Sequence, residues 1–332
     1  MNNAPLRSPD PSYGTAATVG SSSQLPDYLR SAKPNPRSNR APWSKNTAPT
    51  YAGIFLWFVF WDSMSGNGLS AGGLGPTLLG VVLGALICHF LFYLIPGLLG
   101  LKSGLPLYVV GTSTFGAVGG LIMPGFLMGL LQFGWLGVNT WGSSSALASG
   151  FGAPGLYYPL CVIWALGAAF VGLKGIQYVA KVATYLPLIP LAVLVVGLAM
   201  FGGSAANYTP PTEATGAASG PMTAVMLMIT AIVGFFATAG AAGVDFGTNS
   251  RDEKDVQMGG IVGIVIAIIF TAGISVIAVA GARSMGIIDN GTSLMTAALQ
   301  KKLSPGVFAA VAGQVDARFF SRRVFFLIHR RQ

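Results

Sequence analysis

Charged residues are scarce in this sequence. Only 9% of its 332 residues are Asp, Glu, Lys or Arg, whereas an ordinary soluble domain carries roughly a quarter. Hydrophobic residues make up 52%, so too few polar side chains are available to cover a water-exposed surface. This composition excludes a soluble globular protein and predicts an all-α polytopic membrane protein that lies in the lipid bilayer.

Cysteine and histidine are equally scarce, with two of each. Cys88 and Cys161 fall inside apolar segments, which excludes a disulfide framework and a zinc site. A membrane enzyme would need clustered His, Cys or carboxylate side chains, so we expect no enzymatic activity and no bound cofactor. His89 stands alone in an apolar stretch, where a packed histidine is commoner than a proton relay.

The net charge of +9 does not indicate nucleic-acid binding. The basic residues are spread over loops instead of forming one stripe with aromatic side chains. They gather instead on alternate loops. One side of the membrane would hold the basic residues of positions 1–49 together with Lys102, Lys174, Lys181, Arg251 and Lys254. The other side would hold Arg283, Lys301 and Lys302. By the positive-inside rule this predicts a multi-pass cell-membrane protein whose N-terminus is cytoplasmic.

Three regions follow one another along the chain. Residues 1–49 are rich in Pro, Ser and Asn, which predicts a disordered tail. Residues 50–313 form the transmembrane region, in which seven apolar stretches are long enough to cross about 30 Å of hydrocarbon. These stretches lie at 50–74, 77–101, 121–149, 156–174, 176–201, 222–246 and 257–282, and an eighth begins near Pro305. Residues 314–332 turn strongly basic, and we interpret them as the aberrant tail of a truncated or frameshifted reading frame.

Two of the predicted spans contain acids beside runs of glycine. Asp62 precedes Gly66, Gly68, Gly72 and Gly73, and Asp245 lies in the segment ATAGAAGVDFG. An acid at a helix centre costs about 2.5–3.5 kcal/mol, so each one needs an explanation. Broken first and sixth helices are typical of a five-plus-five inverted repeat, in which unwound backbone binds ions or solutes.

Each acid has two interpretations. Asp62 either handles a proton or cation or hydrogen-bonds to unwound backbone. Asp245 lies close to Arg251, Asp252, Glu253 and Lys254, and we favour a capping or salt-bridging role at the end of its span. The glycines themselves could simply allow close helix crossings.

The third span carries a polar and aromatic stripe. Gln132, Trp135 and Asn139 fall within about 60° of one helix face at 100° per residue. An indole beside two amides suits a flat heterocycle, because the ring stacks on the indole and the amides read its donors and acceptors. The alternative is an interhelical amide contact with a space-filling tryptophan.

Four segments together resemble the nucleobase:cation symporter-1 family of purine and cytosine permeases and hydantoin transporters. They are RAPWSKNTAPTYAG, LKSGLPLYVVGTSTFGAVGG, QFGWLGVN and GFFATAGAAGVDFGTNSR. The resemblance implies a LeuT-like five-plus-five inverted-repeat transporter fold, of which about seven and a half of the expected twelve helices would be present. It covers residues from about 40 to 310.

The resemblance also implies a site. By motif, a ring would lie between Trp135 and a sixth-span aromatic, Phe236 in preference to Phe235, with hydrogen bonds to Gln132 or Asn139 and contacts to Thr238 and Ala239. A sodium half site would fall near Phe60, Asp62 and Ser63, and the matching half from the eighth helix is not found. No other metal is expected.

These observations favour a secondary transporter that imports a nucleobase or related heterocycle by symport with Na⁺ or H⁺. Two other hypotheses stay open. The chain could be an inactive fragment or an accessory subunit that acts only with another membrane protein, or a substrate-sensing receptor, for which the tail offers no signalling domain. The sequence does not identify the heterocycle or the coupling ion, because amides fit many rings.

Overall fold

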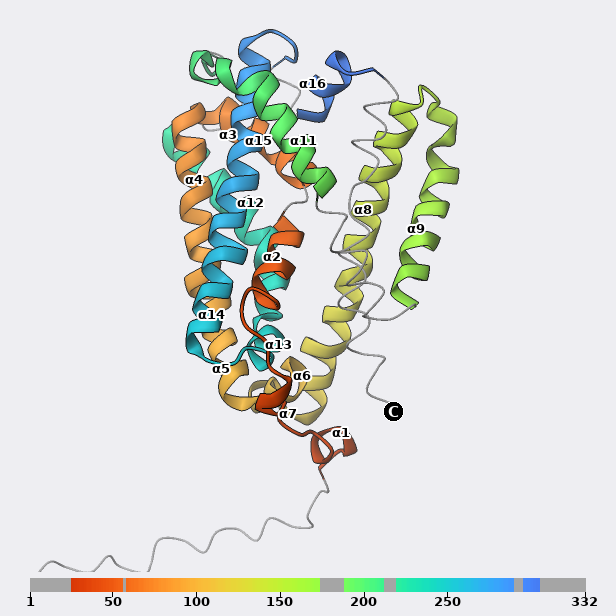
Figure 1. The fold of residues 1–332 in the computed structure, drawn as a ribbon, viewed down its shortest axis with the longest axis vertical. Helices are drawn as coiled ribbons and strands as arrows, with labels where there is room; N and C mark the ends of the chain where they lie inside the picture. Colours follow the sequence, from red (N-terminus) through yellow and green to blue (C-terminus); the bar gives the residue numbers. More distant parts are fainter. Residues whose placement is uncertain (1–24, 56–57, 174–187, 212–218, 290–294, 305–332) are drawn as a thin grey trace, which may run out of the picture. The chain divides into compact units, whose positions relative to one another are not determined.

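The computed structural model describes residues 25–55, 58–173, 188–211, 219–289 and 295–304. The chain divides into two units, residues 1–32 and residues 33–332. Within the described part of the first unit there is one short helix, α1 (Asp27–Arg30). The rest of the description concerns the second unit, whose helices are drawn in Figure 1.

The second unit is helical, and its described residues contain one isolated β-bridge, between Ala41 and Ser250, and no strand. Its α-helices are α2 (Thr47–Phe55), α3 (Phe58–Gly72), α4 (Leu74–Ile87), α5 (Ile95–Ser103), α6 (Leu107–Val110), α7 (Thr112–Leu121), α8 (Met128–Gly150), α9 (Tyr157–Leu173), α11 (Leu188–Phe201), α12 (Pro221–Ala241), α13 (Gly243–Thr248), α14 (Glu253–Gly260), α15 (Ala267–Ser284) and α16 (Met295–Lys302). The 3₁₀ segments are η1 (Arg37–Asn39), η4 (Pro154–Leu156) and η5 (Gly202–Asn207), and the π-helical segments are η2 (Cys88–Leu94), η3 (Ile122–Leu127) and η6 (Ile261–Ile266).

Four helical segments among the described residues are long and apolar enough to cross a membrane. They are Leu74–Ser103, Thr112–Ser145, Pro154–Val171 and Glu253–Ser284, and a bent pair, Pro221–Ala237 with Ala239–Thr248, gives a fifth. These five correspond to the second, third, fourth, seventh and sixth predicted spans. The predicted fifth span is described only over α11, and the predicted eighth span and the tail 314–332 lie outside the described residues.

The seventh span is the most enclosed of these segments. Within Glu253–Ser284, 67% of the apolar window is buried, against 6% in Pro154–Val171. In Figure 1, α15 lies beside α4 and α11, whereas α9 lies beside α8 at the edge of the unit. Helices with apolar side chains on all faces are expected in lipid, so the exposed apolar faces of α8 and α9 fit a multi-pass membrane protein.

Of the four glycines predicted to interrupt the first span, only Gly72 and Gly73 lie at a helix end. α3 continues as a helix through Gly66 and Gly68 and ends at Gly72, and the break at its far end is Gly73, whose φ is +82°. The other boundary, between α2 and α3, is at residues 56–57, which lie outside the described residues. The predicted interruption at Gly66 and Gly68 is therefore wrong.

Close helix packing explains why glycine occurs within α3. A Cβ atom added at Gly68 would lie 2.7 Å from Thr77 Cγ2, and one added at Gly72 would lie 2.7 Å from the carbonyl oxygen of Gly220. Neither distance is sterically possible without a shift of the neighbouring helix. These glycines let α4 and α12 approach α3, as small residues do in membrane bundles.

The predicted break in the sixth span is confirmed. Its two parts meet at an angle of 48° between Ala237 and Ala239, and α12 is followed by α13 after Ala242. The small residues of this stretch allow close approach of the second span, since a Cβ at Gly243 would lie 3.3 Å from the Tyr93 ring.

The segment before the first span is bonded to distant helices, so the predicted tail boundary at residue 49 is too late. Asn35 Nδ2 donates to the Thr248 carbonyl at 3.0 Å, Ala41 N donates to the Asn249 carbonyl at 2.8 Å, and Asn46 Nδ2 donates to the Phe246 carbonyl at 3.3 Å. The first two bonds satisfy carbonyls at the end of α13, where the last carbonyls of a helix lack partners within it; the third adds to the bond that the Phe246 carbonyl accepts from Asn249 N. Residues 1–24 lie outside the described residues.

Candidate functional site

An aromatic pair joins the third span to the bent sixth span. Trp135 of α8 and Phe235 of α12 meet edge to face, with ring centroids 5.1 Å apart and an interplanar angle of 89°. Phe235 is buried and Trp135 is half-buried. Phe235 precedes the 48° bend between Ala237 and Ala239 by less than one helical turn. The pair therefore lies beside the break in the sixth span.

The two candidate phenylalanines, Phe235 and Phe236, make different contacts. Phe235 contacts Trp135, whereas Phe236 is fully buried and its ring lies 5.9 Å from that of Tyr51 in α2. The carbonyl of Ala239 accepts a hydrogen bond of 2.8 Å from the Tyr51 hydroxyl. Phe236 and Ala239 thus face α2, and Phe235 is the sixth-span aromatic residue that meets the indole.

Asn139 lies one turn after Trp135 on α8 and is 2% exposed. Its Nδ2 donates to the Trp135 carbonyl at 2.9 Å, and its Oδ1 has no hydrogen-bond partner among the described residues. The structure therefore brings Trp135, Asn139 and Phe235 together. The side chains of Gln132 and Thr238, also predicted for the site, lie outside the described residues.

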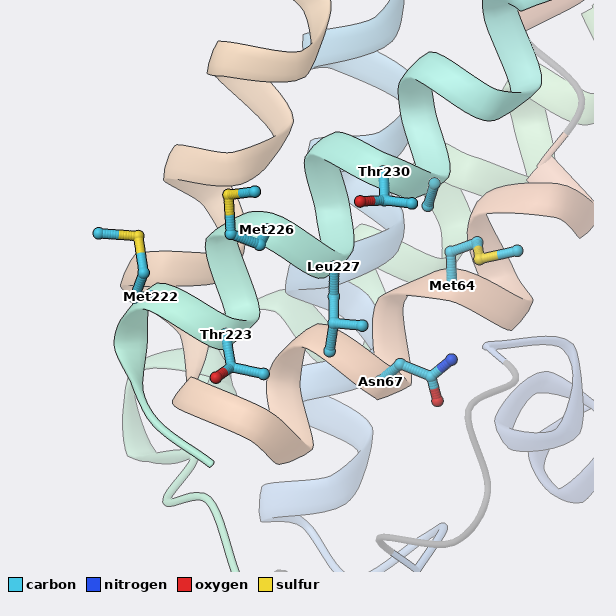
Figure 2. A pocket seen from close by; sticks show the side chains of 8 residues that line it. Met64, Asn67, Met222, Thr223, Met226, Leu227 and Thr230 are labelled. Atoms are coloured by element: carbon cyan, nitrogen blue, oxygen red, sulfur yellow. The ribbon is translucent and has the colours of Figure 1, made fainter. Parts of the chain in front are cut away.

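A cavity of about 520 Å³ lies between α3 and α12 (Figure 2). Met64 and Asn67 come from α3, and α12 supplies the other lining residues, Met222, Thr223, Met226, Leu227, Thr230 and Ala231. The lining is mostly apolar with a few polar groups, as in pockets for small organic molecules. Ala231 is one turn before Phe235, so the cavity follows α12 toward the aromatic pair.

The predicted cation half site is described only in its backbone. Phe60, Asp62 and Ser63 lie in the first half of α3 (Phe58–Gly72), and their side chains lie outside the described residues. Elsewhere in the described chain, no group of three His, Cys, Asp or Glu side chains is placed to hold a metal ion. The sodium half site therefore stays a prediction.

The acid of the sixth span has a structural partner. Asp245 Oδ1 accepts a hydrogen bond of 2.9 Å from the backbone N–H of Leu107, the first residue of α6. Arg251 pairs instead with Asp255, through a 2.7 Å contact, and this bond raises the pKa of the Arg251 guanidinium. Asp245 thus caps a helix of the neighbouring segment, which agrees with a structural role but not with a salt bridge to Arg251.

Arg283, which the sequence places in a loop, is a buried charged residue that bonds to the helix lining the cavity. It is 7% exposed at the end of α15. Its Nη1 donates to Ser70 Oγ at 2.8 Å and to the Gly66 carbonyl at 3.2 Å, both in α3, and to the Tyr208 hydroxyl at 3.3 Å. Arg283 therefore fixes the position of the helix that supplies Met64 and Asn67 to the cavity.

The fold is similar to that of Mhp1, a nucleobase-cation-symport-1 family transporter solved in a closed conformation with bromovinylhydantoin bound. The TM-score is 0.58 at 17% sequence identity, over 87% of this chain and 66% of that one. The chain thus spans about two thirds of the length of that transporter. No protein-family model matches the chain, and no curated protein matches it.

This likeness shows the fold. The predicted fold class, an all-α polytopic membrane protein with the LeuT-like transporter architecture, is confirmed. The bent sixth span described above is one of the elements around which such folds place their sites.

Proposed function

We propose that this chain belongs to a secondary transporter that binds a small, flat heterocycle and moves it across the membrane by symport with Na⁺ or H⁺. The observation that carries the proposal is the Trp135–Phe235 pair, which joins the third span to the break in the sixth. Aromatic faces favour planar rings by stacking, and the neighbouring Asn139 adds a hydrogen-bonding group.

The likeness to Mhp1 supports the same function. That transporter was solved with a hydantoin, a small heterocycle. The ligand class proposed for this chain is correspondingly a nucleobase, hydantoin or related ring, and the proposed orientation places the N-terminus in the cytoplasm. The cavity between α3 and α12 would give the ring a route to the pair.

Uptake measurements test the proposal. Cells that express the full chain should take up radiolabelled cytosine, hypoxanthine or hydantoin in a saturable manner. Trp135→Ala should raise the half-saturating concentration about 5- to 150-fold, because stacking on one aromatic ring is worth about 1–3 kcal/mol. Trp141→Ala is the matched control, since Trp141 lies on the same helix with 55% exposure and its loss should leave uptake unchanged.

Two results would contradict the proposal. Equal losses in the two tryptophan variants would mean that the aromatic pair has no special role. An absence of ligand binding and uptake with the protein present in the membrane would favour a subunit that acts only with another membrane protein. Replacement of Na⁺ by choline, and a change of external pH, would then identify the coupling ion in an active sample.

A further inference from the structure

Exposed basic residues collect where the second and seventh spans meet. Lys102 is the second-last residue of the span Leu74–Ser103, and Lys254 is the second residue of the span Glu253–Ser284. The helices that carry them, α5 and α14, are in contact, and Lys102 Nζ lies 3.8 Å from Glu253 Oε1. Figure 1 shows α5 and the start of α14 at the same end of the second unit. The two lysines therefore lie close together at the ends of two apolar segments.

The N-terminal strap, which we define as residues 33–46, is bonded across this place. The backbone N–H of Asn35 donates at 2.8 Å to the carbonyl of Gly104, the residue that follows α5. The backbone N–H of Trp43 donates at 3.0 Å to Asp255 Oδ1 in α14. These bonds bring further exposed basic residues to the two span ends, and they are Lys33, Arg37 and Lys45.

Positive charge is in excess on the surface formed by the strap and the two span ends. The exposed basic residues there are Lys33, Arg37, Lys45, Lys102, Arg251 and Lys254, and the exposed acids are Asp252 and Glu253. Lys102 pairs with Glu253 at 3.8 Å, and Arg251 pairs with the buried Asp255 at 2.7 Å. The other four basic residues have no salt-bridge partner among the residues that the structure describes. Their charge is thus available to a partner outside the protein.

The position of these residues favours lipid headgroups as that partner. Clusters of about 4–8 Lys and Arg directly beside a membrane span are typical of binding to anionic lipids. Trp43 is half-buried in the strap, and tryptophan is enriched at the depth of the headgroups. A pocket for a small soluble molecule encloses its ligand, whereas these basic side chains are exposed. The positive-inside rule requires basic residues in the loops, but it does not require a strap bonded across two span ends.

We infer that the strap and the adjoining ends of the second and seventh spans form a binding surface for the headgroups of anionic phospholipids. Ammonium and guanidinium groups bind phosphate oxygens through charge-assisted hydrogen bonds. A headgroup that contacts the strap and α14 together holds the strap against the span ends. This inference does not depend on the proposed transport activity.

Lipid binding to the purified full-length chain tests the inference. The detergent-solubilised protein is titrated with phosphatidylglycerol or with phosphatidylcholine of the same acyl chains, and native mass spectrometry gives the dissociation constant of the first bound lipid. Each Lys or Arg near an anionic membrane surface strengthens the attraction about five-fold. Contact with two of them gives an expected preference for phosphatidylglycerol of about 10- to 30-fold.

Two matched double variants separate this surface from net charge. Lys45→Gln with Lys254→Gln removes one charge from the strap and one from α14, and should reduce the preference about five-fold or more. Lys301→Gln with Lys302→Gln removes the same charge from exposed lysines at the end of α16, and should change the preference less than about two-fold. Because all four lysines are exposed, the Tm of both variants should stay close to that of the parent chain.

Three outcomes would overturn the inference. They are equal affinity of the parent chain for the two lipids, an equal loss of preference in the two double variants, and binding of glycerol 3-phosphate as tight as that of phosphatidylglycerol. The last result would identify a site for soluble phosphate groups. Each of these outcomes leaves the proposed function intact, because uptake of heterocycles is measured separately.

Discussion

Replacement of Arg283 by methionine should destabilise the protein strongly. The Nη1 group has two hydrogen atoms and three acceptors within 3.3 Å, Ser70 Oγ, the Gly66 carbonyl and the Tyr208 hydroxyl, so two bonds are made at a time. A hydrogen bond to a charged group contributes about 1.5–3 kcal/mol. Methionine restores part of the packing, which gives an expected loss of about 3–5 kcal/mol, the usual cost of breaking a buried charged network.

The assay is thermal unfolding of detergent-solubilised protein, followed by size-exclusion of the fraction that stays monodisperse. A chain of this size loses roughly 2–4 °C in Tm per kcal/mol, so Arg283→Met should lower Tm by about 6 °C or more. Arg283→Lys keeps the charge without the planar group and should lose less. Arg37→Met is the matched control, because Arg37 is exposed in η1 and its replacement should change Tm by about 1 °C or less.

A Tm for Arg283→Met within about 1 °C of the parent would refute the reasoning. It would mean that the three acceptors find water or other partners at no cost, and that Arg283 does not hold α3 against α15.

Two further predictions concern packing and hydrogen bonding. Gly68→Ala should lower the free energy of unfolding by about 1–3 kcal/mol, because the added Cβ would lie 2.7 Å from Thr77 Cγ2. Gly75→Ala on α4 is the control, since Gly75 faces open space, and it should be neutral or stabilising in the same thermal assay. Equal losses in the two variants would show that contact with Thr77 is not the cause. Tyr51→Phe should lower the free energy of unfolding by about 1–3 kcal/mol, because it leaves the buried Ala239 carbonyl without its 2.8 Å donor. Backbone hydrogen exchange around residues 239–243 should become faster. Unchanged exchange there would contradict the prediction.

The spans were predictable because a membrane helix needs an uninterrupted apolar stretch. The ends of five predicted ranges agree with described segments to within about four residues, except that the third segment begins at Thr112 and not at residue 121. The roles of the glycines in the first span were not predictable from the sequence. Glycine serves both to end helices and to allow close packing, and only the contacts of Gly68 with Thr77 show which role applies.

The site was predictable in its elements but not in its contacts. Phe235 and Phe236 are adjacent, and neighbours on a helix point about 100° apart, so a small rotation of α12 decides which ring meets Trp135. Arg283 follows directly after a predicted span and was placed in a loop. Its acceptors are 75 to 217 residues distant in sequence, and no local pattern reveals such partners.

The bonds between residues 35–51 and the sixth span also have a consequence for biogenesis. They join positions separated by 188 to 213 residues. At translation rates of about 5–20 residues per second, the partners of Asn35 and Tyr51 leave the ribosome roughly 10–40 s later than these residues do. During that interval the side chains of Asn35, Asn46 and Tyr51 lack these acceptors, and chaperones or membrane-insertion factors have time to bind the segment first.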